Sequence, residues 1–386
     1  MFFLFLLVLA LPAYGSEVVL AREGKGSLQK RGRYFLLHLK GKPYEMGYQH
    51  GKLLRPQIRE LLKVIVNDLG KEPLPLGGSA SKINLKDFLL RLFEVQRPFY
   101  KARYLQEMKG IADGAGIPLR YVQIANHLPE LFHCSGFALL GKATSDGEVL
   151  HGRVLDYMTD RHLQDYAAVI VAEPEGFNSF INVSFAGFIG SVTGMNEKHI
   201  AIGEMGGGGQ LFWAGEPMAF LVRRVLEEAN TLEEALSIFR NSPRTCEYYY
   251  VISSGLERKA IGLATTWQDL FVLMPGQYHE LLPEPIPDCV ILSADERYRK
   301  LVERVRAGYG RFEEKSALRL MDAPVAMKEN LHNVLMKPKS GDLWVAYAGP
   351  DGSGAWKQPY VHLNLFDILG RKKKPFATSQ KFSSRR

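Results

Sequence analysis

Cys134 is the residue of this sequence best placed to act as a nucleophile. It stands near the start of an apolar run, and a second run along the chain ends with Arg153 and Asp156. The Asp146-Gly147 pair between the two runs predicts a hairpin, which places the start of the first strand beside the end of the second. A cation favours the thiolate form of cysteine, and a carboxylate can orient the attacking group or hold an ammonium. The pattern therefore predicts an activated thiol at Cys134.

A base for this thiol is not supplied by any obvious histidine pair, although His133 and His151 lie near Cys134 in the sequence. A cysteine at the start of a mature chain carries its own base, because the ordinary pKa of an α-amino group is about 7.7 to 8.0. This chemistry requires a free amino group on Cys134. We therefore expect a cleavage site between His133 and Cys134.

A plainer interpretation treats Cys134 as a small buried core residue, and Arg153 and Asp156 as an ordinary ion pair. Side chains three apart on a strand point to opposite faces, so a meeting of these two charges requires a bend or a strand end. The sequence contains no Gly-x-Ser-x-Gly, His-Glu-x-x-His or Cys-x-x-Cys motif, which argues against a serine esterase, a zincin and a dithiol redox protein. We expect neither a metal nor a cofactor, since His127 and His133 lack metal-ligand spacing.

The predicted secondary structure that positions these residues is mainly helical before Cys134 and β-rich after it. Apolar spacing before it predicts a long helix after Gly51 and a second helical stretch from about Asn84 to Ala115. After Cys134 come short β-rich runs, then two helices at 217–229 and 232–239, then further strand-like runs. This order along the chain, with strands, then two helices, then further strands, predicts an α+β body of two sheets with helices packed outside them.

Composition and charge exclude several classes. The chain has 386 residues, of which 46% are hydrophobic and 23% charged, which is typical of a globular protein. The net charge of +8 arises almost wholly after Gly370, where seven Lys and Arg residues stand without an acidic residue. We interpret 370–386 as a basic flexible tail. No nucleic-acid motif accompanies it, so no nucleic-acid partner is expected.

Residues 1–15 read as a signal peptide, because an apolar run from Phe2 is followed by Ala13-Tyr-Gly15, with small residues at the positions before a cleavage. The run is too short for a stable membrane span of about 20 residues. We therefore expect a secreted or periplasmic protein. In an oxidising compartment the odd count of three cysteines leaves one thiol to explain. With Cys134 set aside as reactive, a disulfide between Cys246 and Cys289 is predicted.

The motifs around Cys134 resemble a known group of enzymes. The runs Cys134-Ser-Gly-Phe137 and Gly152-Arg-Val-Leu-Asp156-Tyr are similar to the opening of the N-terminal nucleophile hydrolases that act on linear amide C–N bonds, which include choloylglycine hydrolase, acid ceramidase and penicillin acyltransferase. Upstream, two segments look like the propeptide half of the penicillin acyltransferase branch: Gly47-Tyr-Gln-His-Gly51 and Glu107-Met-Lys-Gly-Ile-Ala-Asp-Gly-Ala-Gly116. A turn of the hydrolases resembles Gly194-Met-Asn-Glu-Lys198.

This resemblance implies a four-layer αββα fold, with a mainly helical propeptide or small subunit at 16–133 and a catalytic region at 134–369. It implies self-cleavage just before Cys134 and attack of the thiol on a small-molecule N-acyl amide to form a thioester. Cys134 would then be nucleophile and base, Arg153 the cation that steadies it, and Asp156 the partner of its ammonium. Hydrolysis and acyl transfer both remain open, as does the oligomeric state.

One departure from the family pattern bears on activity. Where the family shows a Thr-Asn pair whose amide helps to bind the oxyanion, this sequence has Leu292-Ser-Ala-Asp295. The oxyanion hole then needs another donor, for which Met205, Gly206 and Asn196 are candidates. The same departure keeps a second class open, in which the chain is a catalytically silent exported protein that keeps the fold to bind a ligand. Four apolar residues favour an aromatic or fatty acyl chain, although core packing explains them equally well: Phe137, Phe188, Phe212 and Trp213.

Overall fold

The computed structural model describes residues 18–71, 84–127, 133–157, 159–207, 211–280 and 282–371. The expected signal peptide at 1–15 and nearly all of the basic tail lie outside these residues. Within them, one sheet has ten strands in the order β1-β2-β3-β6-β7-β8-β9-β10-β11-β12. Its strands are β1 (Val19–Glu23), β2 (Gly26–Arg31), β3 (Tyr34–Gly41), β6 (Ala167–Pro174), β7 (Phe180–Phe185), β8 (Thr193–Asn196), β9 (Ile200–Gly206), β10 (Tyr248–Ser254), β11 (Lys259–Thr265) and β12 (Leu270–Leu273).

A second, six-stranded sheet in the described residues has the order β13-β4-β5-β14-β15-β16 and is antiparallel throughout. Its strands are β4 (His133–Leu139), β5 (Leu150–Asp156), β13 (Cys289–Leu292), β14 (Asn330–Lys337), β15 (Asp342–Tyr347) and β16 (Val361–Asn364). The predicted hairpin across Asp146 and Gly147 is confirmed, because β4 and β5 pair directly and Gly147 has the positive φ of 72° that a tight turn uses.

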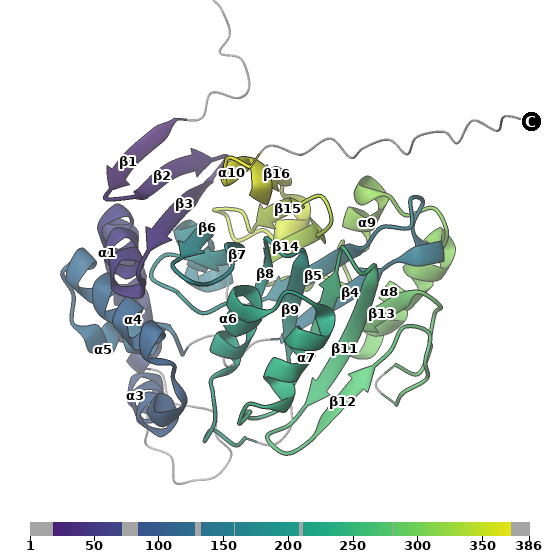
Figure 1. The fold of residues 1–386 in the computed structure, drawn as a ribbon, viewed down its shortest axis with the longest axis horizontal. Coiled ribbons are helices and arrows are strands. Elements are labelled where there is room, and N and C mark those ends of the chain that lie inside the picture. The colour runs from purple at the N-terminus through teal and green to yellow at the C-terminus, as the bar shows by residue number, and fades with distance from the viewer. Residues whose placement is uncertain are drawn as a thin grey trace, which may run out of the picture.

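The two sheets pack face to face. A Cβ atom at Gly136 of β4 would lie 2.6 Å from Met205 Sδ, and one at Gly203 of β9 would lie 2.8 Å from Arg153 Cγ. Glycine at these two positions lets the sheets approach closely at the level of Cys134. Helices α6 (Met218–Glu228) and α7 (Leu232–Arg240) pack on β8, β9 and β10, and helices α8 (Asp295–Gly308) and α9 (Glu314–Arg319) pack on β13, β5 and β14. The expected αββα layering is therefore present (Figure 1).

The segment before Cys134 is less helical than expected, because β1, β2 and β3 extend the large sheet. Strand β3 pairs in parallel with β6 from the other side of Cys134. In the described part of this segment, five α-helices follow and gather at one end of the molecule (Figure 1): α1 (Pro43–Leu53), α2 (Arg55–Lys63), α3 (Leu85–Gln96), α4 (Ala102–Ala115) and α5 (Leu119–Ala125). The helix expected after Gly51 is present as α2, which buries Ile58, Leu61 and Leu62 but is shorter than expected. The helix α1 before it, which contains Gly51, was not expected.

Glycines explain the contact between α1 and α4. A Cβ at Gly47 would lie 2.0 Å from the Glu107 carbonyl oxygen, and one at Gly51 would lie 2.4 Å from the Ile111 carbonyl oxygen. Any larger residue at Gly47 or Gly51 would push the two helices apart. The glycine-containing motifs that resemble a propeptide are thus the contact between these helices.

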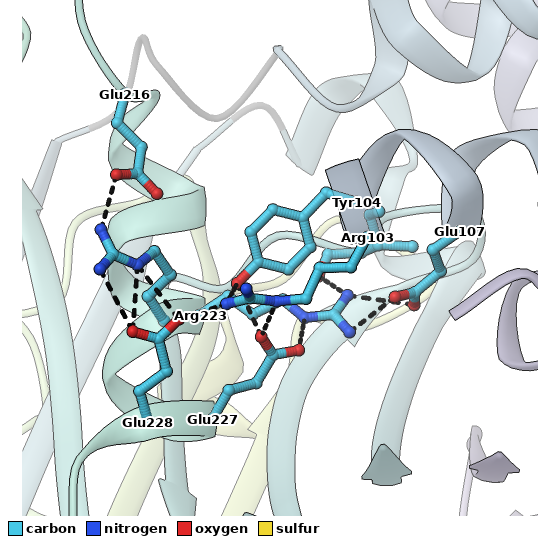
Figure 2. Close-up of polar contacts among 9 residues, drawn as sticks. Arg103, Tyr104, Glu107, Glu216, Arg223, Glu227 and Glu228 are labelled. Atoms are coloured by element: carbon cyan, nitrogen blue, oxygen red, sulfur yellow. Dashed lines mark hydrogen bonds and ion pairs between the residues drawn. The ribbon is translucent and has the colours of Figure 1, made fainter. Parts of the chain in front are cut away.

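A buried ionic network joins α4 to α6 (Figure 2). Arg223 Nη2 lies 2.7 Å from Glu107 Oε2 and Arg223 Nε lies 2.9 Å from Glu227 Oε1, and the three side chains are at most 3% exposed. Tyr104 donates its hydroxyl to Glu227 Oε2 at 2.7 Å, and Arg103 Nε lies 2.9 Å from the same oxygen. The network therefore ties the segment before Cys134 to the segment after it.

Replacement of Arg223 by methionine is expected to lower the free energy of unfolding by about 3 to 5 kcal/mol, because it leaves Glu107 buried without its cation. Urea unfolding followed by circular dichroism measures the change. Lys109→Met on α4, the helix that carries Glu107, is the matched control, since its ion pair with Asp113 is exposed and its loss should have little effect. Equal stability of the two variants would show that the network adds nothing.

The predicted disulfide between Cys246 and Cys289 is wrong, since none of the three cysteines forms a disulfide. Cys246 lies two residues before Tyr248, which pairs with Gly206 near the site, whereas Cys289 pairs with Leu139 at the far end of β4 from Cys134. Cys246 therefore lies just before β10 of the large sheet, whereas Cys289 begins β13 of the small sheet.

None of the helices in the described residues has the length and apolar character that a membrane span requires.

Candidate active site

The pairing of β4 with β5 brings Cys134 and Arg153 together. Cys134 pairs with Leu155, and Gly136 pairs with Arg153. Cys134 and Arg153 are therefore diagonal neighbours on the same face of the sheet, the face that meets β9. Arg153 is fully buried, and its Nη2 donates a hydrogen bond to Cys134 Sγ at 3.0 Å. The cation expected beside the thiol is in direct contact with it.

Two further residues hold the Arg153 guanidinium in place. Nε and Nη2 donate to the Glu204 carbonyl oxygen at 3.1 and 3.0 Å, and Nη2 lies 3.3 Å from Glu204 Oε2. Nη1 donates to His332 Nε2 at 3.1 Å, where the ring is neutral because burial and the charge of Arg153 hold the pKa of His332 well below its usual range. Arg153 therefore has a fixed orientation before any substrate arrives.

The thiol of Cys134 is protonated at neutral pH in the uncut chain. Burial raises the pKa of Cys134 to about 12, and the charges of Glu204 and Asp156 act in the same direction. The charge of Arg153 and a hydrogen bond from the backbone of Gly206 oppose this rise. Contact with a cation is thus not sufficient to make a thiolate here, and a base is needed.

Asp156 lies opposite His133, the residue that precedes Cys134. It is the last residue of β5, where the pairing with β14 shifts register between Asn330 and His332. Its Oδ2 accepts a hydrogen bond from Arg297 Nη1 at 2.9 Å, and its Oδ1 accepts one from the Met327 backbone N–H at 3.0 Å. Burial raises the pKa of Asp156 to about 6, although the Met327 N–H and Arg297 lower it. The carboxylate therefore borders the peptide bond expected to be cut.

A cavity of about 700 Å³ opens at Cys134. Met205 and Gly206 line it. The segment from Leu292 to Asp295, which differs from the family pattern, also lines it. In that segment Ser293 Oγ lies 2.7 Å from Ser135 Oγ, so its hydroxyl is held by the residue next to Cys134. The remaining lining residues among those described are Gly207, Tyr249, Glu280, Pro283, Arg297, Tyr298 and Met327.

Asn196, the third oxyanion candidate, does not reach this cavity. Its amide donates to the carbonyl oxygens of Leu226 and Ala229, and its own carbonyl accepts from the backbone N–H groups of Lys198 and Ile200. Asn196 thus shapes the turn before β9 and the end of α6.

None of the four apolar residues expected to favour an apolar acyl chain lines the cavity in the part of the chain described. For example, Phe137 is buried against Gly152.

The sequence reasoning missed Glu204, His332, Arg297 and Met327. Glu204 carried a detectable signal, because it is a charged residue inside the apolar run that forms β9. His332 and Arg297 reach the site from distant parts of the chain, and nothing in their local sequence marks them. In the described residues, no group of three or more His, Cys, Asp or Glu side chains could hold a metal ion.

Comparison with known proteins adds to this picture. The family model of acyl-coenzyme A:6-aminopenicillanic acid acyl-transferase matches residues 142–264. The matched range contains Arg153, Asp156 and Glu204, and Cys134 lies just before it. Protein dcd1B of Dictyostelium discoideum is 29% identical over 267 residues, which cover 63% of this chain and 53% of that protein. Acid ceramidase of Rattus norvegicus is 27% identical over 175 residues, which cover 38% of this chain and 43% of the ceramidase.

The N-acylethanolamine-hydrolyzing acid amidase of Cavia porcellus is 25% identical over 177 residues, which cover 43% of this chain and 49% of the amidase. The chain spans about half the length of the curated relatives it matches. Among solved structures, the Caenorhabditis elegans ortholog of that amidase matches with a TM-score of 0.44 and 18% identity, over 60% of this chain and all of that one. The family model and the curated relatives support the N-terminal nucleophile hydrolase superfamily as the class of this chain.

Proposed function

We propose that this chain is a cysteine N-terminal nucleophile enzyme that hydrolyses linear amide bonds or transfers their acyl groups through a thioester on Cys134. The observation that carries the proposal is the buried contact of 3.0 Å between Arg153 Nη2 and Cys134 Sγ, with Asp156 placed opposite the preceding residue. An acyl-enzyme of this kind divides one difficult amide cleavage into two easier steps.

Self-cleavage would create the missing base. Cys134 Sγ attacks the His133 carbonyl carbon, the C–N bond breaks, and the nitrogen takes up a proton to become the α-amino group of Cys134. Water then hydrolyses the thioester, which leaves a carboxylate on His133. Asp156 is the buried carboxylate beside this bond, and it is suited first to accept the thiol proton and afterwards to hold the new ammonium.

In the cut enzyme the α-amino group of Cys134 accepts the thiol proton, and the thiolate attacks the substrate carbonyl. Arg153 stabilises the thiolate, and the backbone N–H of Gly206, which hydrogen-bonds the thiol, donates to the oxyanion. The α-ammonium then protonates the leaving amine. The thioester passes its acyl group to water or to a second amine.

Sequencing of the N-termini and intact mass of the purified protein test this proposal. Two pieces are expected, one that ends at His133 and one that begins at Cys134, of about one third and two thirds of the mature chain. Because we also propose export, the small piece should begin at Ser16. An active preparation whose His133–Cys134 bond is intact would refute the mechanism.

A further inference from the structure

Arg153 makes contacts with both strands that flank it in the small sheet. Strand β5 lies between β4 and β14, and Leu155 of β5 pairs with Cys134 on one side and with His332 on the other. Arg153, two residues before Leu155, points to the same face as these residues. Its Nη2 lies 3.0 Å from Cys134 Sγ, and its Nη1 lies 3.1 Å from His332 Nε2. The guanidinium therefore joins the thiol to the imidazole.

The contact with Arg153 fixes the position of the proton on the His332 ring. An arginine can only donate hydrogen bonds, so Nε2 must be the acceptor and the ring proton lies on Nδ1. The hydroxyl of Thr193 also donates to Nε2, at 3.3 Å. The ring is neutral, because burial and the charge of Arg153 keep the pKa of His332 well below its usual range. His332 therefore presents a lone pair to Arg153 at neutral pH.

Packing alone does not explain a histidine at this position. The ring is fully buried, with its centroid 6.3 Å from that of Phe185 in a stacked contact and 5.5 Å from that of Tyr347 in a T-shaped contact. Nδ1 is buried and has no hydrogen-bond partner within the described residues. A buried N–H group without a partner destabilises a folded protein, and an apolar side chain would avoid that cost. What the histidine adds is the lone pair on Nε2.

The two side chains that orient Arg153 differ in charge. Glu204 Oε2 lies 3.3 Å from Nη2, so its carboxylate both holds the guanidinium and offsets the positive charge. His332 holds Nη1 and carries no charge. A neutral acceptor fixes the guanidinium without weakening its attraction for a thiolate. His332 can therefore orient the cation at no cost to its effect on Cys134.

We propose that His332 is a positioning residue for the thiol chemistry, because its Nε2 lone pair fixes Arg153 with Nη2 directed at Cys134 Sγ. This rests on the proposed function, since it assigns a role in the same reaction. Without the acceptor, the buried Nη1 group loses its hydrogen-bond partner, and rotation of the guanidinium towards other oxygens draws Nη2 away from the sulfur. Less thiolate then forms, and each step that uses the thiolate slows.

The test separates the acceptor from the ring. His332→Leu and His332→Phe remove the lone pair, whereas His332→Gln keeps a neutral acceptor in its side-chain carbonyl. The rate at which iodoacetamide alkylates Cys134 in the cut enzyme, followed by peptide mass from about pH 6 to about pH 10, reports the thiolate fraction. The Leu and Phe variants should lower both this rate at neutral pH and kcat by about tenfold, with little change in KM. The difference in alkylation should shrink at high pH, and the Gln variant should stay within about threefold of the wild type.

His127→Leu is the matched control. The His127 ring is also fully buried, and burial lowers its pKa to about 4, but it contacts Tyr100 and not Arg153. This variant should lose stability without a change in the pH dependence of alkylation. The inference is overturned if the Leu and Phe variants at His332 alkylate as the wild type does. It is also overturned if the Gln variant slows as much as they do, since packing would then explain the histidine.

Alkylation also separates this inference from the proposed function. Wild-type protein that stays uncut and hydrolyses no amide would refute the function. The contact between Arg153 and His332 is present in the uncut chain, so alkylation of uncut wild type and uncut His332→Leu would still decide the inference. A rate about tenfold lower in the variant supports it, and equal rates overturn it.

Discussion

The Cys134→Ala protein is expected to remain one uncut chain and to lose turnover by about a thousandfold or more. The substitution removes the thiol that attacks the His133 carbonyl and later the substrate, so both processing and catalysis stop. Electrophoresis measures the first effect, and release of amine from an N-acyl amide measures the second. The alanine also removes the hydrogen bond that Arg153 donates to Sγ at 3.0 Å, but Glu204 and His332 continue to hold the guanidinium.

Two matched controls make this result specific to one thiol. Cys246→Ala and Cys289→Ala each remove a buried cysteine that forms no disulfide and does not line the cavity in the described part of the chain. Both variants should process and turn over as the wild type does. A Cys134→Ala protein that is still cut and still active would show that Cys134 is a core residue, and the interpretation as a silent binding protein would then replace ours.

The contact between Cys134 and Arg153 was predictable because it depends on local pairing. An Asp146-Gly147 turn between two apolar runs fixes the register of a hairpin, and that register places Arg153 diagonally across from Cys134. The layered α+β architecture followed in the same way, from the change between helical and alternating patterns at Cys134.

The rest of the site depends on contacts that no local pattern encodes. Glu204 and His332 reach Arg153 from a different sheet and a distant strand, and Arg297 comes from the first turn of α8. The strands before residue 42 were missed because β3 joins the large sheet by pairing with β6, a strand far along the chain at 167–174, and no local pattern encodes that pairing. The disulfide was predicted from the number of cysteines alone, and that number says nothing about the distance between the two thiols.

The Asp156→Asn protein is expected to turn over N-acyl amides at least about a hundredfold more slowly while it keeps its fold. The change removes a charge and little volume, so the hydrogen bond from the Met327 N–H can persist on the amide oxygen. What is lost is the negative charge beside the new ammonium of Cys134 and the acceptor for the thiol proton. Asp160→Asn, an exposed change outside the cavity, is the control and should have no effect.

The pH dependence separates a functional from a structural role of Asp156. The carboxyl is neutral below its pKa of about 6 and charged above it, so self-cleavage of the wild-type precursor should slow about tenfold for each pH unit below 6. Stability should change in the opposite direction. Because burial raises this pKa above the usual 3.8, folding favours the protonated form, and its contribution is lost as the pH rises through about 6. Asp156→Asn should therefore be no less stable than the wild type at pH 8, yet cut slowly at every pH. A variant that loses activity only in proportion to lost stability would show that Asp156 serves the fold alone.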